Sequence, residues 1–231
     1  MKPFSVVYLS GGVGTRMRRE IPKQYLIIDS KPIALYGFEC FLTLPEVEEI
    51  VVVCEEKYEN FFNSLAQPRS IHLQFARPGD RRQDSVLSGI QKLKNNPLVC
   101  IHDSARPFID KDLVRRVVNA GHEHNAATVG MPVKMTIKKC DALKMVTETP
   151  QRDFLWEIQT PQVVRLDLLK EGFEFVKKHQ QTVTDDVSLV ELIGKPVQLV
   201  EGSYFNIKIT TPEDLVTAEQ FVTMRKSDAL L

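Results

Sequence analysis

The fold is decided by one stretch, Phe4-Ser5-Val6-Val7-Tyr8-Leu9-Ser10-Gly11-Gly12-Val13-Gly14-Thr15-Arg16, in which an apolar run passes directly into a glycine-rich loop. The apolar run has the length of a buried strand. Glycines let backbone N–H groups approach an anion closely, and Arg16 and the following Lys23 add positive charge. We therefore predict a buried strand that ends in a loop for a ligand with several phosphates.

Two familiar phosphate loops do not fit this spacing. A P-loop needs Gly-Lys-Ser/Thr at its end, and none follows Gly14. A dinucleotide fingerprint needs a third glycine where Met17 stands and an acidic residue about twenty positions on, and Glu39, near that distance, falls in a predicted helix. The glycines alone would also suit an ordinary tight turn, so the prediction of a phosphate loop depends on Arg16 and Lys23.

The bulk composition indicates one globular domain, residues 1–231. Thirty basic and thirty acidic side chains give a formal net charge of zero, which argues against a nucleic-acid partner. The apolar runs are too short to span a membrane, and Met1-Lys2-Pro3 leads into a strand rather than a signal peptide, so we expect a cytoplasmic protein. The four cysteines (Cys40, Cys54, Cys100 and Cys140) lack a C-x-x-C spacing and are expected to be reduced and mostly buried.

Apolar runs of strand length alternate with segments of helix length, which is typical of an α/β fold with a mostly parallel, twisted sheet. The expected strands are 4–9, 50–54, 71–75, 98–102, 127–132, 197–200 and 205–209. The expected helices are 32–44, 58–65, 83–94, 110–121, 167–178, 186–193 and 212–224. Residues 133–153 have too few apolar side chains for a core, and we predict a protruding β-arm that pairs with another molecule.

Polar clusters follow several of these strands, where ligands bind in open α/β sheets. In the cluster 78–85, Gly79 and Asp80 permit a tight turn, and Ser85 lies in the first helical turn, where free N–H groups and its hydroxyl can bind polar ligand atoms. The alternative is a capped turn with solvated arginines.

A second cluster, Val99–Pro107, contains an apolar strand that ends in Asp103. A single carboxylate there is what a Mg²⁺ site shared with substrate phosphates requires, although Asp103 could instead cap a turn or pair with Arg106. Strand alternation points His102 away from Asp103, so we expect His102 to be structural. Farther along, Lys208 lies among apolar residues, where a cation needs an anionic partner.

Five motifs in order resemble those of the 2-C-methyl-D-erythritol 4-phosphate cytidylyltransferase family. They are Ser-Gly-Gly-x-Gly-Thr-Arg-Met with Pro-Lys-Gln, His-Asp-Ser-Ala-Arg-Pro, Gln-Thr-Pro-Gln, Thr-Asp-Asp, and Asn-Ile-Lys-Ile-Thr-Thr-Pro-Glu-Asp-Leu. The resemblance implies a Rossmann-like nucleotidyltransferase that joins CTP to methylerythritol phosphate and releases pyrophosphate, in isoprenoid precursor synthesis. This sequence departs from the family at Gln151, where Asp is frequent, and at Ser10-Gly11-Gly12, where alanines are frequent.

The resemblance also implies roles for individual residues. Catalysis falls to Arg16, Lys23, Arg152 and Lys208. Nucleotide binding falls to Ser10, Gly11, Gly12, Gly14, Gly79, Asp80, Ser85 and Ser104. Acceptor binding falls to Asp103, Arg106, Thr136, Arg152, Thr160, Thr184 and Lys208. Asp103 is also implied as the Mg²⁺ ligand, and the arm 133–153 is implied to be exchanged in a homodimer, so that Thr136 and Arg152 reach the partner's sugar phosphate.

The chemistry accounts for the lack of a nucleophile–base pair in these motifs. A phosphate monoester has a second pKa near ~6, so the acceptor is already largely a dianion and needs no general base. Positioning and charge neutralisation are then the tasks of Mg²⁺, Arg and Lys.

Two alternatives stay open at this stage. A ribitol-5-phosphate cytidylyltransferase of the same fold would differ mainly near Thr136, Arg152 and Thr184. A catalytically silent nucleotide-binding scaffold would be expected to lose its phosphate-facing cations, whereas Arg16, Lys23, Arg152 and Lys208 are all present.

Overall fold

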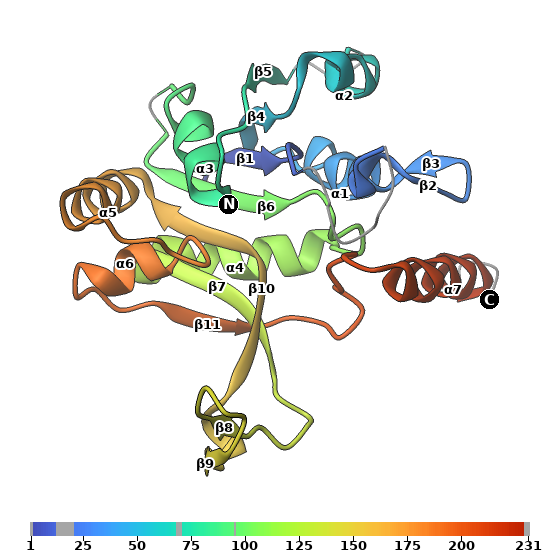
Figure 1. Ribbon diagram of the computed structural model, residues 1–231. Coiled ribbons are helices and arrows are strands. Elements are labelled where there is room, and N and C mark those ends of the chain that lie inside the picture. The colour runs from blue at the N-terminus through green and yellow to red at the C-terminus, as the bar shows by residue number, and fades with distance from the viewer. Residues whose placement is uncertain (1, 13–20, 68–70, 95, 229–231) are drawn as a thin grey trace.

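A seven-stranded, mostly parallel sheet forms the centre of the computed structural model, which describes residues 2–12, 21–67, 71–94 and 96–228 (Figure 1). Its strand order is β11-β7-β10-β6-β1-β4-β5. Only β10 runs antiparallel to its neighbours among the described strands of this sheet. The α/β fold class expected from the sequence is confirmed.

The sheet strands and helices have the following bounds. The strands are β1 (Phe4–Leu9), β4 (Val47–Val53), β5 (His72–Ala76), β6 (Leu98–Asp103), β7 (Ala126–Pro132), β10 (Trp156–Arg165) and β11 (Gln198–Glu201). The helices are α1 (Ile33–Leu42), α2 (Glu59–Ala66), α3 (Arg82–Ile90), α4 (Lys111–His124), α5 (Leu166–His179), α6 (Ser188–Leu192) and α7 (Pro212–Asp228).

Helices cover both faces of the sheet, because alternate strand residues face opposite sides. In β1, Val6 and Tyr8 join a buried cluster with α1, α2 and α4. Val7 and Leu9 join a second cluster with α3, α5 and α6. Strands buried on both faces read as continuous apolar runs, which is why β1, β4 and β6 could be recognised from the sequence.

A third, smaller cluster attaches α7 to the rest of the molecule. Ala218 and Val222 of α7 pack with Ile28 and Ile33, beside the short hairpin of β2 (Ile27–Ile28) and β3 (Lys31–Pro32). Ile209, just before α7, belongs to the same cluster. Its packing fixes the segment that leads from the sheet to α7.

The predicted arm is present as a projecting hairpin between β7 and β10 (Figure 1). It contains the short strands β8 (Lys139–Cys140) and β9 (Val146–Glu148). Residues 134–149 are all exposed, and the side chains of Met135 and Leu143 are 74% and 83% exposed.

Two sequence expectations for the sheet were wrong. β10 was not expected, because Gln159, Thr160 and Gln162 are polar and Pro161 interrupts the strand pattern, yet the three polar side chains are buried. Residues 205–209 were expected to form a strand but pair with no strand of the described chain, and their apolar side chains pack beside α7.

The cysteine expectation is confirmed for the free thiols and only partly for burial. Cys54 and Cys100 are buried, Cys40 is half-buried, and Cys140 is exposed on the arm. None of the helices in the described part of the chain is both long and apolar enough to cross a membrane.

Candidate active site

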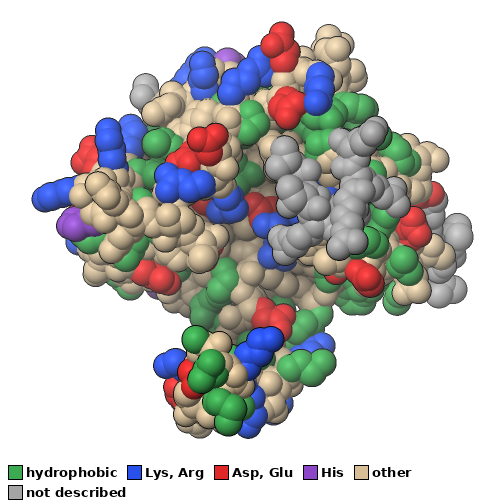
Figure 2. All heavy atoms as spheres, viewed as in Figure 1, with side chains coloured by type: hydrophobic (Ala, Val, Ile, Leu, Met, Phe, Trp, Pro, Cys, Tyr) green, Lys and Arg blue, Asp and Glu red, His purple; other side chains and the backbone are tan. Residues whose placement is uncertain are grey.

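A cleft lies at the carboxyl ends of β1, β4, β5 and β6, which is the edge where open α/β sheets bind ligands. Its volume is about 600 Å³. Figure 2 shows acidic and basic side chains together in the hollow at the centre of this face. The residues that line the cleft are Leu9, Gly11, Gly12, Lys23, Gln24, Glu55, Pro78, Gly79, Asp80, Arg81, Arg82, Ser85, Asp103, Ser104, Ala105, Lys208 and Thr210.

The start of the glycine loop is held by the segment that contains Lys23. Gln24 donates two hydrogen bonds from Nε2, to the carbonyls of Ser10 at 2.9 Å and Gly12 at 2.8 Å. Gly11 must be glycine because a Cβ atom there would lie 2.4 Å from the Pro78 ring. Gln24 thus fixes Gly11 and Gly12 in the cleft wall beside Lys23, a role that the sequence analysis did not assign to it.

Ser10 itself turns inward. It is 1% exposed, donates to the Tyr25 hydroxyl at 3.0 Å and accepts from the Ser104 hydroxyl at 3.1 Å. Of the two serines, only Ser104 lines the cleft. Gly14, which was predicted to bind the nucleotide, and Arg16, which was predicted to be catalytic, lie outside the described residues.

The opposite wall is the turn before α3. The Gly79 N–H donates to the Ser85 hydroxyl at 3.0 Å, and the Arg81 N–H donates to the Asp84 carboxylate at 3.1 Å. A Cβ atom at Gly79 would lie 2.5 Å from the Asp84 Cβ, so the turn closes tightly only with glycine. Gly79, Asp80 and Ser85 are therefore brought together as predicted, while their binding role stays a prediction.

Asp103 occupies the floor of the cleft between two cations. Its Oδ1 accepts from Arg82 Nε at 3.0 Å and its Oδ2 accepts from Lys208 Nζ at 2.5 Å. Burial alone would raise the pKa of the Asp103 carboxyl, but the charges of Arg82 and Lys208 outweigh it and hold that pKa well below its ordinary value. Asp103 is thus ionised, and Lys208 has the anionic partner that its sequence position required.

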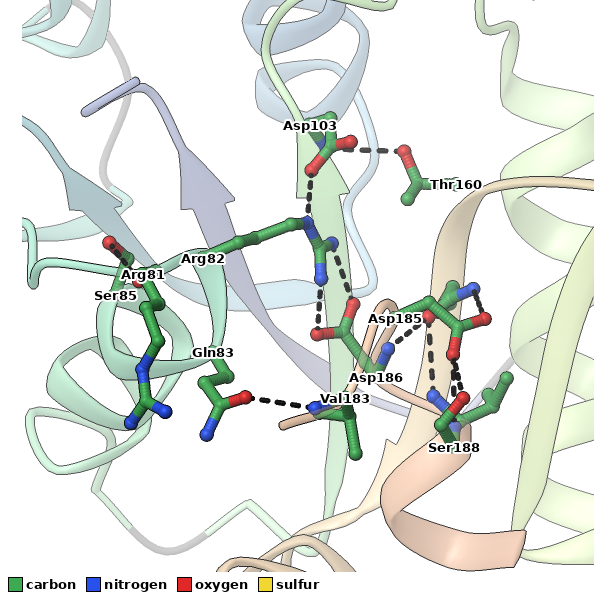
Figure 3. A network of polar contacts seen from close by, with 12 residues as sticks. Arg81, Arg82, Gln83, Ser85, Asp103, Thr160, Val183, Asp185, Asp186 and Ser188 are labelled. Carbon is green, nitrogen blue, oxygen red and sulfur yellow. Dashed lines mark hydrogen bonds and ion pairs between the residues drawn. The ribbon is translucent and has the colours of Figure 1, made fainter. Parts of the chain in front are cut away.

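Arg82 was missed by the sequence analysis, although it connects two carboxylates (Figure 3). Its Nη1 and Nη2 each bind Asp186 at 2.8 Å, in a bidentate pair, while its Nε binds Asp103. Asp186 is 2% exposed and lies in the loop between α5 and α6. The sequence offered no signal for this contact, because Arg82 and Asp186 are 104 positions apart.

Two hydrogen bonds hold the segment that contains Lys208, one on each side of it. Ile209 N–H donates to the Ala105 carbonyl at 2.9 Å, and Arg106 Nη1 donates to the Asn206 carbonyl at 2.7 Å. Arg106 is not among the lining residues, and its second contact is the Ile158 carbonyl at 3.4 Å. In this structure Arg106 contacts the segment that holds Lys208, and acceptor binding by it stays a prediction.

Thr160 and His102 lie beneath Asp103. The Thr160 hydroxyl accepts the Asp103 N–H at 3.1 Å and lies 3.0 Å from His102 Nδ1. His102 is fully buried on the other face of β6, as strand alternation predicted, and burial lowers its pKa to about 4. Thr160 is 4% exposed and contributes no atom to the cleft lining described above.

The remaining predicted acceptor residues are not among those that line this cleft. Thr136 is on the exposed arm, and Arg152 lies at its base, donating from Nη1 to the Lys134 carbonyl at 2.9 Å. Thr184 is exposed in the loop between α5 and α6. In the described residues, no group of three or more His, Cys, Asp or Glu side chains is arranged to hold a metal ion.

Comparison with known proteins gives a consistent result. The family model described as "IspD: 2-C-methyl-D-erythritol 4-phosphate cytidylyltransferase" matches residues 4–224. The chain is 48% identical over 222 residues to the chloroplastic enzyme of that name from Oryza sativa subsp. japonica, covering 96% of this chain and 75% of the relative. It is 40% identical over 215 residues to the enzyme of that name from Chlamydia pneumoniae, covering 93% of this chain and 97% of the relative.

The fold has solved counterparts. The crystal structure of 4-diphosphocytidyl-2C-methyl-D-erythritol synthase from Anaerococcus prevotii DSM 20548 matches with a TM-score of 0.85 and 27% identity. That match covers 96% of this chain and 99% of the other.

Proposed function

Because the chain belongs to the 2-C-methyl-D-erythritol 4-phosphate cytidylyltransferase family, we propose that its cleft binds CTP and methylerythritol phosphate and joins them with release of pyrophosphate. The chain is a CTP-dependent nucleotidyltransferase of isoprenoid biosynthesis. The observation that carries the proposed site is the convergence of Lys23, Lys208 and ionised Asp103 on one cleft opposite the Gly79–Ser85 turn.

The two walls of the cleft have different roles in this proposal. The turn with Gly79, Asp80 and Ser85 binds the cytidine side, and Lys23 and Lys208 bind the phosphates, with Arg16 in the same role by family resemblance. The acceptor is already a dianion, so the reaction needs charge neutralisation around the α-phosphorus and no general base. The buried neutral His102 lies on the other side of β6 and is not required as a base.

We propose that Asp103 also holds a divalent cation. The Asp103 carboxylate has about four lone-pair sites, of which Arg82 takes one on Oδ1 and Lys208 one on Oδ2, so each oxygen keeps a site for a metal ion. Mg²⁺ is usually held by one or two carboxylates together with substrate phosphates, which matches a single Asp in the cleft wall. Bound there, the cation would neutralise phosphate charge, and Asp103 would hold and orient it.

The arm is proposed to complete the acceptor site of a second copy. Thr136 and Arg152 lie on or at the base of a hairpin that projects from the body, so a partner's cleft is the place they can serve (Figure 1). The exposed side chains of Met145 and Phe154, at 65% and 78%, supply apolar area for such an interface. A homodimer and a cytoplasmic site of action are both part of the proposal.

The test is pyrophosphate release by the purified chain with CTP and Mg²⁺. Release is expected with methylerythritol phosphate and is expected to stop on addition of EDTA. Release only with ribitol 5-phosphate would contradict the acceptor assignment. Release with neither acceptor, from folded protein, would overturn the proposed function.

A further inference from the structure

His102 is placed where it cannot contact a ligand in the cleft but can control the residues that do. It is the residue before Asp103 in β6, and its side chain is 0% exposed. Its ring packs against those of Tyr8 and Phe41, with centroids 5.8 and 5.6 Å away. Neighbouring strand residues face opposite sides, so Asp103 points into the cleft while His102 points into the core.

The hydrogen bonds of His102 fix which of its nitrogens carries the proton. Nε2 lies 3.1 Å from the Arg106 carbonyl, which can only accept, so Nε2 is the donor. In a neutral ring Nδ1 is then an acceptor, and the Thr160 hydroxyl at 3.0 Å donates to it. With its proton committed, the Thr160 oxygen accepts the Asp103 N–H at 3.1 Å.

These hydrogen bonds hold the Asp103 amide just beyond the end of the β6–β10 ladder. The antiparallel ladder between β6 and β10 ends at the Ile101–Gln162 pair, so the Asp103 N–H lies beyond it. The Thr160 hydroxyl takes the amide that a strand carbonyl would otherwise accept (Figure 3). The β1 ladder, which pairs Leu9 with Asp103, holds one side of the Asp103 backbone; Thr160 holds the side that faces β10, and His102 orients Thr160.

The other nitrogen of His102 controls the turn that holds Lys208. The Arg106 carbonyl accepts from His102, and the Arg106 guanidinium donates to the Asn206 carbonyl. The neighbouring Ala105 carbonyl accepts from Ile209. The segment that contains Lys208 is thus bonded on both sides of Lys208 to the turn that His102 holds.

We propose that His102 is a positioning residue for the transfer reaction, which in its Nε2–H tautomer sets Asp103 through Thr160 and the Lys208 segment through Arg106. The inference rests on the proposed function of this cleft. It assigns His102 no contact with substrate. A loss of positioning should appear in kcat more than in the KM for CTP, since misplacement by about 1 Å can cost on the order of 100-fold in rate.

The test compares variants that keep or remove each hydrogen bond. Thr160→Val removes the hydroxyl at nearly constant shape, and Thr160→Ser keeps it. His102→Phe removes both nitrogens, and His102→Asn can place an amide oxygen near the Nδ1 position. We expect Thr160→Val and His102→Phe to lower kcat about 10- to 100-fold with a small change in the KM for CTP, because a misplaced reacting group loses rate on this scale. Thr160→Ser should keep more of kcat than Thr160→Val, because it keeps the hydroxyl, and His102→Asn should keep more of it than His102→Phe.

Two further readouts separate positioning from other roles. The double variant His102→Phe/Thr160→Val should lose less kcat than the product of the two single losses, because His102 acts on the Asp103 amide only through Thr160; fully multiplied losses would overturn the proposal. Nitrogen-15 NMR of labelled histidine, with the His102 signal assigned by its loss in His102→Asn, should show the Nε2–H tautomer. An Nδ1–H tautomer would overturn the proposal.

Failure of the proposed function is distinguishable from failure of this inference. A folded wild type without transfer activity would overturn the proposed function. An active wild type in which Thr160→Val retains full kcat would overturn the positioning role alone. Because Thr160→Val conserves volume, full kcat in this variant would overturn the inference even if His102→Phe does not fold.

Discussion

Replacing Arg82 with alanine is expected to destabilise the protein by about 3–5 kcal/mol, because it leaves partly or fully buried carboxylates without their cation. Asp186, at 2% exposure, loses both of its 2.8 Å contacts with Arg82, and Asp103, at 10% exposure, loses one of its two cations. For a chain of this size, about 2–4 °C of Tm corresponds to each kcal/mol, so Tm should fall by roughly 6–20 °C. Urea denaturation and thermal melting at pH 7 measure both quantities.

The neighbouring Arg81 provides a matched control. Arg81 is 52% exposed and pairs with Asp84 on the surface, where ion pairs contribute about 0–1 kcal/mol. Arg81→Ala should therefore change the free energy of unfolding by less than about 1 kcal/mol. Adding Asp186→Asn to Arg82→Ala should recover part of the loss, since it removes one uncompensated buried charge. Equal destabilisation by Arg81→Ala and Arg82→Ala, or a loss of under 1 kcal/mol in Arg82→Ala, would refute this reasoning.

Three other predictions concern turnover, assembly and the thiols. Lys23→Ala or Lys208→Ala should lower kcat on the order of 10²–10³-fold, by analogy with the loss of one oxyanion-hole donor. The exposed control Lys92→Ala should not lower kcat. Wild-type turnover in Lys23→Ala and Lys208→Ala would contradict their assignment to phosphate binding. A mixture of inactive Arg16→Ala and Arg152→Ala chains should regain partial activity, because a hybrid dimer has one site with both arginines; no recovery from proven hybrids would place Arg152 in its own chain's site. Cys54 and Cys100 should stay unlabelled by a thiol reagent at pH 8 until the protein is unfolded in urea, because both thiols are buried. Burial also raises the pKa of the Cys54 thiol to about 12. Fast labelling of these two thiols in the native protein would contradict their burial.

The elements that the sequence predicted are those whose stability comes from apolar burial with a regular period. β1 and β6 are apolar on both faces and were recognised as strands to within a residue of their observed ends. β10 was missed because its buried positions are polar and satisfied by distant partners. Gln162, for example, donates to the Thr128 hydroxyl at 3.0 Å and accepts the Asp186 N–H at 2.7 Å. The hydrophobicity pattern of a sequence does not indicate such hydrogen bonds between distant residues.

The opposite error occurred at residues 205–209, where apolar and polar residues alternate in the sequence but form no strand. Ile209 packs with α7, and the Asn206 amide donates to Gln159 Oε1 and the Thr160 carbonyl. Burial does not follow the sequence alternation here, since polar Asn206 is fully buried while Phe205 is 46% exposed. A short run of alternating residues therefore does not show what the backbone pairs with.

The site shows the same division between what is local and what is distant. The Gly79–Ser85 turn was predictable because its hydrogen bonds join residues within six positions of each other. Arg82 was not, because Asp103 and Asp186 lie 21 and 104 positions away. Resemblance to a family supplies the second kind of residue only where the motif includes it, and it does not state which atoms face the ligand.

Thr160 illustrates why that last distinction matters for mechanism. Family resemblance placed it in the acceptor site, yet its hydroxyl proton is directed to His102 and its oxygen accepts the Asp103 amide. A loss of activity on replacing Thr160 would be expected under either role. The two roles differ in coupling, because a substrate contact would act independently of His102, whereas a positioning contact cannot. The His102–Thr160 double variant therefore decides between them, and the cleft can be understood as charged groups held from behind by neutral, buried hydrogen bonds.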